Sequence, residues 1–305
     1  MESPASTLVI VTAPPRLRVG VIGTGRAGSV IAAALQRAGH PVVAASAVSD
    51  LSRLRAEALL PTTPIVDLAD VATTADLVLV AVPDDALMGL VQGLAKAGVV
   101  TPGQFWMHLS GRYGIGALEA VTEEGALPLA IHPVMSFTGT SIDLARLADC
   151  PFGVTAPDAL RTAAEALVIE MGGEPVWVPE DSRALYHSAL AFGSNFLITL
   201  VAQSAELLQR AGIEHPQRVL GPLLGASLDN ALRLGDQALT GPVARGDARS
   251  VAAHLEVIGE QSSTAQDAYR ALARVTADRA VEAGLLSPSL AAPLLEVLNS
   301  QGSQS

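Results

Sequence analysis

The chain has 305 residues, more than one hydrophobic core usually supports, so about two domains are expected. Its formal net charge of −11 argues against a general binder of nucleic-acid phosphates. The single cysteine, Cys150, excludes an internal disulfide framework and a cysteine-based zinc site. The composition is 50% hydrophobic but only 3% aromatic, which is typical of a parallel sheet covered by helices.

The first 15 residues, MESPASTLVIVTAPP, lack the positive region of a signal peptide. We expect residues 1–15 to be a flexible leader of a cytoplasmic protein. No apolar run reaches the roughly 18 uncharged residues that span a bilayer, so no membrane contact is expected.

The first motif is an apolar strand at residues 19–22 that runs directly into Gly23-x-Gly25-x-x-Gly28 and then into a helix. This spacing predicts a dinucleotide-binding turn, in which Gly23 permits the tight turn, Gly25 the approach of a pyrophosphate, and Gly28 close helix packing. The free N–H groups at the start of the helix would face the phosphates. An ordinary tight strand-to-helix turn is the alternative. The predicted phosphate-binding residues are Gly23, Thr24, Gly25, Arg26, Ala27 and Gly28.

Strands and helices then alternate, which predicts an α/β fold with a Rossmann-type, doubly wound, mainly parallel sheet over residues 16–180. A helix is expected near 51–60, and another begins at Pro83-Asp84-Asp85. The predicted strands lie at residues 19–22, 41–46, 64–66, 76–82, 105–110, 127–132, 152–155 and 175–178.

From residue 181 the pattern changes to long helices, which predicts an all-helical second domain over 181–305. Asp181 is the expected N-cap of its first helix, and Gly212 is the expected stop.

Five motifs extend this two-domain plan along the chain. They are VAVPDD at 80–85, HLSG at 108–111, HPVMSF at 132–137, YHSALAFGSN at 186–195 and LTGPVARGD at 239–247. Together they resemble the Rossmann-like plus DUF2520 family, and the resemblance covers nearly the whole chain after about Arg16.

The broader group with this plan contains 6-phosphogluconate dehydrogenases, pyrroline-5-carboxylate reductases and ketopantoate reductases. The resemblance implies an NADP-dependent oxidoreductase, and some relatives are regarded as alternative ketopantoate reductases of pantothenate synthesis. Because helical second domains of this group often dimerise, it also implies a homodimer.

The end of the second strand indicates the cofactor. Enzymes that bind NAD place an Asp or Glu there, whereas residues 44–47 read Ala-Ala-Ser-Ala. Ser46 and, just beyond it, Ser49, Arg53 and Arg55 offer hydroxyl and guanidinium groups that suit the 2′-phosphate of NADP. The alternative is that both arginines only solvate a helix. We expect NADPH to bind at least about tenfold more tightly than NADH.

Two further segments are expected beside the cofactor. Val82, Pro83 and Asp84 follow the most apolar predicted strand, and Val82-Pro83 would form a wall at the nicotinamide ribose. Asp84 is alternatively the cap of the next helix. Ser110 follows another strand and is expected to contact the cofactor as well.

The proton donor is constrained by the lysine content. Lys96 is the only lysine, and it lies in the helix after Pro83. Many relatives with this plan use a lysine of the helical domain to protonate the carbonyl oxygen, and this chain cannot do so. Histidine is the best alternative because its reference pKa is about 6.5.

Three histidines are candidates for this role. His108 and His132 lie at the C-terminal ends of predicted parallel strands, where ligands of open α/β sheets bind, and His187 lies on the first helix of the second domain. Ser194 is seven residues after His187 and almost on the same helical face, with Asn195 about 80° further round. These side chains could protonate and hold a substrate, or could be ordinary hydrogen-bonded residues of a packed helix. We expect the other three histidines, His40, His215 and His254, at the surface or in turns.

A late turn is a candidate for binding the substrate carboxylate. Thr240, Gly241 and Pro242 open a helix, and Arg245 could hold a carboxylate through two hydrogen bonds. A pair between Arg245 and Asp247, or helix capping, is equally compatible with the sequence.

Metal and serine-hydrolase chemistry have little support. The paired acids at 84–85 and 123–124 lack a histidine at ligand spacing, and neither HExxH nor GxSxG occurs.

These observations favour an NADP-dependent reductase of a small 2-oxo acid, with ketopantoate as leading candidate and His187 as proton donor. A reductase of an imine or other carbonyl compound, of the pyrroline-5-carboxylate reductase type, is one alternative. A dinucleotide-binding sensor without hydride transfer is another, because fold alone does not decide function.

Overall fold

The computed structural model describes residues 16–300, and it divides into two compact units after Leu190. Unit 1 is the part up to Leu190, and unit 2 begins at Ala191. The division falls inside a long helix, later than the boundary at 180 expected from the sequence. The expected leader, 1–15, lies outside the described residues.

Unit 1 is built on a seven-stranded sheet with strand order β2-β1-β3-β4-β5-β6-β7. Neighbouring strands are parallel except β5 and β6, which are antiparallel, so the expected mainly parallel α/β sheet is confirmed. The chain reverses its direction of travel across the sheet between β1 and β3, and ligands of open α/β sheets bind at the C-terminal ends of strands where this happens. The strands are β1 Val19–Ile22, β2 Val42–Ser46, β3 Leu77–Val80, β4 Phe105–His108, β5 Leu127–Pro133, β6 Pro151–Thr155 and β7 Glu174–Trp177.

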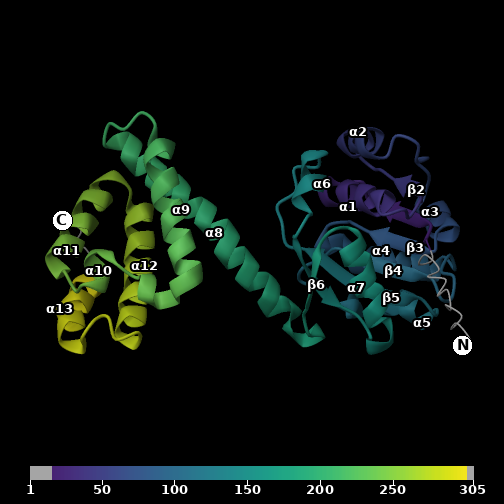
Figure 1. The fold of residues 1–305 in the computed structure, drawn as a ribbon. Coiled ribbons are helices and arrows are strands. Elements are labelled where there is room, and N and C mark those ends of the chain that lie inside the picture. Colours follow the sequence, from purple (N-terminus) through teal and green to yellow (C-terminus); the bar gives the residue numbers. More distant parts are fainter. Residues whose placement is uncertain (1–15, 301–305) are drawn as a thin grey trace, which may run out of the picture. The chain divides into compact units, whose positions relative to one another are not determined.

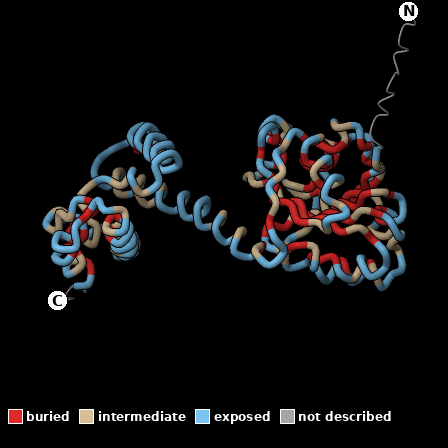
Figure 2. The backbone as a smooth tube through the Cα atoms, turned by 60° about the horizontal axis from the view of Figure 1, so that its bottom comes forward, coloured by how far each residue is buried: buried red, intermediate tan, exposed pale blue. Residues whose placement is uncertain are grey.

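Helices cover both faces of this sheet (Figure 1). On one face, α1 and α7 share a buried apolar cluster with the strands, and on the other face α3, α4 and α5 share a second cluster. In α4, Leu87, Val91 and Leu94 are buried at the spacing of one helical face. Figure 2 shows the buried backbone concentrated in the sheet. The helices of unit 1 are α1 Arg26–Arg37, α2 Asp50–Leu59, α3 Leu68–Thr74, α4 Asp84–Lys96, α5 Glu119–Glu123, α6 Ile142–Arg146 and α7 Arg161–Glu170.

The strand expected at 64–66 is reduced to one bridge, between Ala45 and Ile65. The segment hydrogen-bonds to both backbone groups of Ala45 and then turns into α3, because the Asp67 side chain accepts from the backbone N–H of Asp70 and caps that helix. The predicted strand at 64–66 was therefore wrong, except for the one bridge at Ile65.

The alternative role of Asp84 as a helix cap is excluded, since Pro83 occupies the N-cap position of α4. Two other side chains differ from their expected places. Asp181 lies in a short 3₁₀ turn, so it does not cap the next helix. His40 is buried rather than at the surface, because its ring accepts from the Leu17 N–H and pairs with Glu170.

Unit 2 has a small core of its own in α10 to α13, where Val251, Leu255, Ala277 and Leu294 are buried. A positive φ of 87° at Gly212 accompanies the expected stop of the long helix α8. The helices from α8 onward are α8 Arg183–Arg210, α9 Pro216–Leu234, α10 Gly241–Ala244, α11 Ala248–Gln261, α12 Ser263–Glu282 and α13 Pro288–Asn299.

Most residues of helix α8 are exposed, and the rest are half-buried apart from Arg183 (Figure 2). Arg183 is its single buried residue, and the segment Glu180–Arg210 has a mean hydropathy of 1.3 in its most apolar window, none of which is buried. By length and composition alone this helix could cross a membrane, which corrects the expectation that no segment reaches that threshold.

Candidate active site

The turn between β1 and α1 meets the steric requirements of a dinucleotide-binding turn. Gly23 has a φ of +97°, and a Cβ on it would lie 2.6 Å from the Ala81 carbonyl oxygen. A Cβ on Gly28 would overlap the Gly23 carbonyl oxygen and lie 2.7 Å from the Ala81 Cβ. Glycine at both positions is therefore what lets α1 pack against the segment after β3.

The same turn leaves room for an anion. A Cβ on Gly25 would meet nothing within 4 Å, so its backbone is open to a ligand. Gly25 is the N-cap of α1 without a side-chain cap, and the first turn of the helix contains no acidic residue. The N–H groups of this first turn, which includes Arg26 and Ala27, can therefore bind a pyrophosphate.

Two predicted cofactor residues hold the turn in place. The Thr24 hydroxyl is fully buried and donates to the carbonyl oxygen of Ser52 over 3.0 Å. The Ser46 hydroxyl accepts from the Gly23 N–H over 3.2 Å. Ser49 caps α2 by accepting from the Ser52 N–H. The Ser46 hydroxyl thus joins the glycine turn to β2, and the Thr24 hydroxyl joins it to α2.

Arg26 and Arg55 lie near this turn. Of the two arginines predicted to bind the 2′-phosphate, Arg53 and Arg55, only Arg55 lies there. A Cβ on Gly139, which has a φ of +80°, would lie 2.9 Å from Nε of Arg55 and 3.1 Å from Cγ of Arg26. Arg53 is exposed. The cationic pair beside the α1 N-terminus is therefore Arg26 with Arg55, and these residues fit a dinucleotide that carries an additional phosphate.

A buried carboxylate shapes the loop that meets this pair. Asp143 of α6 accepts from the N–H groups of Thr138 and Gly139 over 2.7 and 2.8 Å. Burial opposes its ionisation, but hydrogen bonds from Gly139 and Thr138 outweigh it and lower the Asp143 pKa. The carboxylate thereby fixes Gly139 against Arg55.

The other predicted cofactor residues occupy the ends of β3 and β4. Val82 is half-buried against the second apolar cluster, Pro83 is exposed and Asp84 is half-buried. Ser110 is buried, and its hydroxyl accepts from the N–H groups of Arg112 and Tyr113. Ser110 therefore shapes the turn after β4.

His108 is fully buried and engaged on both ring nitrogens. Nε2 lies 2.9 Å from the Gly114 carbonyl oxygen, and Nδ1 accepts from the Ser110 N–H over 3.1 Å. Burial lowers its pKa to about 4, so the ring is neutral near pH 7. This geometry gives His108 a structural role, in which its ring joins the two ends of the loop after β4.

His132 and His187 meet above Gly111. A Cβ on Gly111 would lie 2.9 Å from Nε2 of His132 and 2.8 Å from Cδ2 of His187, and the two ring centroids are 6.2 Å apart. Nδ1 of His132 lies 3.0 Å from the Tyr186 hydroxyl. We call His132, His187, Tyr186 and Gly111 the His132 cluster.

A buried guanidinium lies behind the His132 cluster. Arg183 is 1% exposed and donates to the Thr155 hydroxyl and to the carbonyl oxygens of Ser110, Ala130 and Gly153. All these acceptors are neutral, and Arg183 therefore supplies positive charge to the site. Such a charge favours negative charge that develops on a reacting oxygen.

The remaining predicted site residues belong to unit 2. Ser194 and Asn195 are exposed on α8, and Arg245 is exposed at the end of α10. Thr240 and Gly241 open α10, as expected. Within unit 1, the structure brings together His132 and His187.

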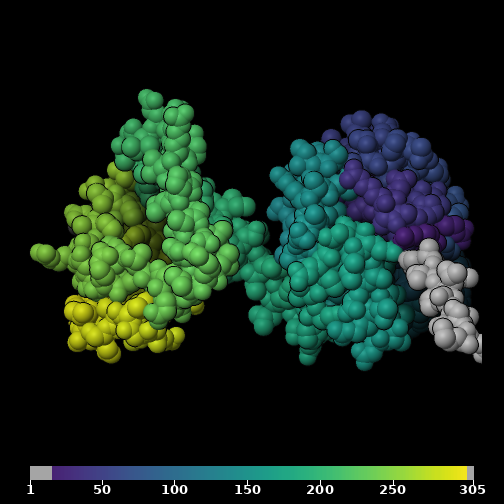
Figure 3. Space-filling view, in the orientation of Figure 1, coloured from purple at the N-terminus to yellow at the C-terminus, as the bar shows by residue number. Residues whose placement is uncertain are grey.

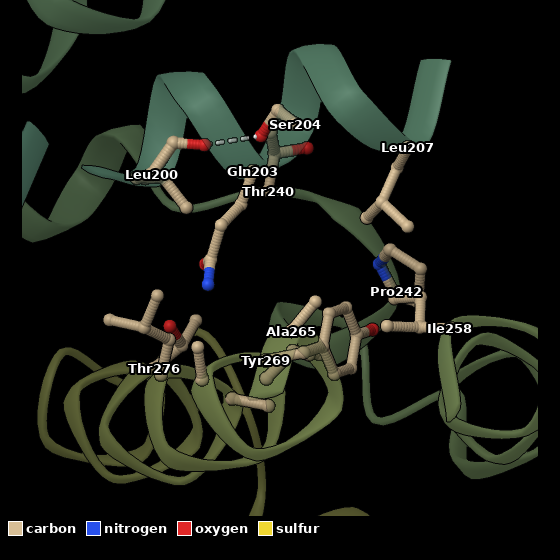
Figure 4. A pocket seen from close by; sticks show the side chains of 14 residues that line it. Leu200, Gln203, Ser204, Leu207, Thr240, Pro242, Ile258, Ala265, Tyr269 and Thr276 are labelled. Atoms are coloured by element: carbon tan, nitrogen blue, oxygen red, sulfur yellow. Dashed lines mark hydrogen bonds between the residues drawn. The ribbon is translucent and has the colours of Figure 1, made fainter. Parts of the chain in front are cut away.

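Unit 2 also contains a hollow between helices (Figures 3 and 4). Its volume is about 300 Å³, and no charged side chain lines it. Gln203 and Tyr269 point toward it from α8 and α12. The lining thus fits apolar rather than charged groups.

Within residues 16–300, no cluster of three potential metal ligands occurs. Tyr186, Arg183 and Gly111 were missed as site residues, although Tyr186 and Gly111 lie inside the motifs YHSALAFGSN and HLSG. The adjacency of Tyr186 to His187 was an available signal, because the residue before a helical site residue can reach the same sheet edge.

Comparison with known proteins divides the chain earlier than the structure does, inside unit 1. A model of the Rossmann-like domain matches residues 1–133, and a model of DUF2520, a domain of unknown function, matches residues 150–276. The chain combines a Rossmann-like domain with a DUF2520 domain. The family resemblance of the five motifs is therefore confirmed. No curated protein matches the chain.

Several solved structures share this fold. A Bacteroides fragilis protein provisionally assigned as an NADP oxidoreductase has a TM-score of 0.71 and 23% identity, covering 86% of this chain and 98% of its own. A Pseudomonas imine reductase has a TM-score of 0.63 and 18% identity, covering 93% and 100%. A Plasmodium falciparum pyrroline carboxylate reductase with NADP bound has a TM-score of 0.56 and 11% identity, covering 87% and 98%. At these identities the likeness shows the fold.

Proposed function

We propose that this chain is an NADP-dependent reductase of a small 2-oxo acid, with ketopantoate as the first candidate substrate. The observation that carries the proposal is one sheet edge in unit 1. The strands β1, β3, β4 and β5 are parallel neighbours, so the glycine turn after β1 and the His132 cluster after β4 and β5 share that edge. Ligands of open α/β sheets bind there.

The cofactor assignment is supported by the groups around the glycine turn. Gly25 leaves the backbone open, the first turn of α1 is uncapped, and Arg26 and Arg55 add positive charge. No carboxylate directly follows β2, where one would bind the ribose hydroxyls of NAD. NADPH is therefore the expected cofactor, and one structure of similar fold has NADP bound.

The reaction requires a hydride donor, a proton donor and groups that position the substrate. NADPH, when bound, supplies the hydride to the carbonyl carbon. His187 gives a proton to the carbonyl oxygen as the C=O π bond breaks, and it recovers that proton from solvent. Arg183 favours the negative charge that develops on the oxygen, and the absence of a side chain on Gly111 lets the rings of His132 and His187 lie close to its backbone.

A C=N substrate is the second candidate. It is favoured by the likeness to the Pseudomonas imine reductase and the Plasmodium pyrroline carboxylate reductase, which extends over at least 87% of this chain. The same residues serve this reaction, since hydride adds to carbon and the proton goes to nitrogen.

The decisive experiment follows NADPH oxidation with a panel of 2-oxo acids, including ketopantoate, and cyclic imines. We expect turnover with one class, and a fall of at least about 100-fold in His187→Ala, the low end of a general acid's contribution. His215→Ala is the matched control, because His215 is an exposed histidine of unit 2. Saturable NADPH binding without turnover across the panel would contradict the proposal and favour a dinucleotide-binding sensor.

We also propose that the protein acts as a homodimer, in which a second copy covers exposed apolar residues of α8 and α9. These residues, the α8–α9 surface, are Phe192, Phe196, Leu197, Ile198, Leu200, Val219, Leu223, Leu228 and Leu232. All belong to unit 2, and each is at least 40% exposed. Apolar exposure of this extent is typical of an interaction site.

A further inference from the structure

The contact between His132 and Tyr186 depends on a glycine in the neighbouring strand. His132 of β5 pairs in register with Gly153 of β6. A Cβ on Gly153 would overlap the Tyr186 hydroxyl oxygen, so the missing side chain lets this hydroxyl approach Nδ1 of His132 to 3.0 Å. The rings of Tyr186 and His132 are edge to face, with centroids 5.8 Å apart. The pair is thus held by packing as well as by a hydrogen bond.

Burial raises the pKa of Tyr186, so its hydroxyl keeps its proton near pH 7 and can donate it to Nδ1 of His132. A neutral imidazole that accepts at Nδ1 carries its proton on Nε2. Nε2 lies 2.9 Å from where a Cβ of Gly111 would be, so this N–H is on the side of the ring where His132 and His187 meet.

The surroundings keep His132 neutral. Burial, then the charges of Arg183 and His187, lower its pKa to about 4, while Asp84 of α4 acts in the opposite direction. His108, on β4, adds a smaller lowering effect. Near pH 7 His132 is therefore a hydrogen-bond donor without a charge.

We propose that Tyr186 fixes His132 as its Nε2–H tautomer, and that His132 thereby holds the substrate's reacting oxygen or nitrogen as a neutral hydrogen-bond donor. His132 is the catalytic residue of this pair and Tyr186 is a positioning residue. The proposal rests on the proposed function for its catalytic half. His187 still supplies the proton, because a neutral imidazole that donates a hydrogen bond polarises the acceptor and keeps its own proton.

The first test is independent of activity. In the full-length protein labelled with ¹⁵N, we expect His132 Nδ1 to show the shift of an unprotonated nitrogen and Nε2 that of a protonated one, unchanged from pH 7 to about pH 5. Tyr186→Phe removes only the hydroxyl and is expected to give a mixture of tautomers. A protonated Nδ1 in the wild type, or no change of tautomer in Tyr186→Phe, would overturn the proposal.

The chain contains a matched control pair. In unit 2, the Tyr269 hydroxyl lies 2.9 Å from Nδ1 of His254, and the two rings pack edge to face in the same way. Tyr269→Phe is expected to alter the ¹⁵N signals of His254 and to leave those of His132 unchanged. Thermal unfolding of each variant shows whether a lost signal reflects loss of the fold.

The second test separates the donor role from mere packing. His132→Gln retains a side-chain N–H and His132→Ala does not, so kcat should be at least about tenfold higher in His132→Gln. Tyr186→Phe should lower kcat several-fold with a smaller change in KM. Equal kcat in the two His132 variants would overturn the catalytic half. If no substrate turns over, the proposed function fails, while the ¹⁵N measurement still decides the tautomer.

Discussion

His108 couples the stability of the fold to pH. Its ring is fully buried and its pKa is lowered to about 4 by burial, whereas an unfolded chain has a histidine pKa near 6.5. Between these values the unfolded chain binds more protons than the folded protein. The free energy of unfolding therefore falls as the pH is lowered through this window, by up to about 3 kcal/mol for His108.

Urea unfolding at several pH values between about 4 and 7 measures this dependence, and His108→Gln should reduce its slope. His132 also contributes to the pH dependence of the unfolding free energy, and His108→Gln retains that contribution. The exposed His215 provides the control, since His215→Gln should leave the slope unchanged. The same slope in His108→Gln as in the wild type would contradict the assignment.

Residue types alone could not distinguish the roles of the histidines. His108 and His132 both lie at the ends of apolar strands, yet one closes a loop through both ring nitrogens and the other meets His187 at Gly111. The difference depends on Gly153 and Arg183, which are distant in sequence and reach His132 through strand pairing and helix packing. Such contacts leave no periodic pattern in the chain.

At the scale of elements, the strands of unit 1 were largely predictable because apolar runs are bounded by Gly, Pro or Asp. β1, β3 and β4 are examples, and Gly23-x-Gly25-x-x-Gly28 correctly marked a tight turn into α1. The direction of β6 was not predictable, since a strand looks the same in either direction. The segment at 64–66 failed as a strand because the cap of α3 follows at once.

Helix α2 provides a test of cofactor selection. Arg55 approaches Gly139 and Arg26, whereas Arg53 on the same helix is exposed. If Arg55 binds a 2′-phosphate, Arg55→Ala should weaken NADPH binding at least about tenfold and change NADH binding much less. Arg53→Ala is the matched control and should change either affinity less than about threefold.

Fluorescence titration with both nucleotides gives these affinities. Equal weakening of NADPH and NADH in Arg55→Ala would show a general effect on the turn and would contradict a phosphate-specific role. Equal affinity of the wild type for the two nucleotides would contradict the assignment of NADP itself.

For the whole molecule, the distribution of apolar surface is the main unexplained feature of unit 2. The nine residues of the α8–α9 surface are 40% to 80% exposed. Together they expose on the order of 1,000 Å², whereas a standard interface buries about 800 Å² on each partner. Apolar residues of α8 around 192–200 are exposed on successive positions, so a single neighbouring helix of unit 2 does not cover them.

A second copy of the chain is the occupant we expect on this surface, so the protein should sediment at micromolar concentration with twice the 31.2 kDa mass of one chain. Phe196→Glu combined with Leu232→Glu places charge among the apolar side chains and should shift the protein to monomer, because each buried unpaired carboxylate costs several kcal/mol. Ile169→Glu is the matched control, since Ile169 is 61% exposed on α7 of unit 1 and the substitution should leave the dimer intact.

A monomeric wild type would contradict the homodimer, and its flotation with phospholipid vesicles would show that α8 meets a membrane instead. Dimerisation that survives both charged substitutions would place the interface elsewhere on the chain.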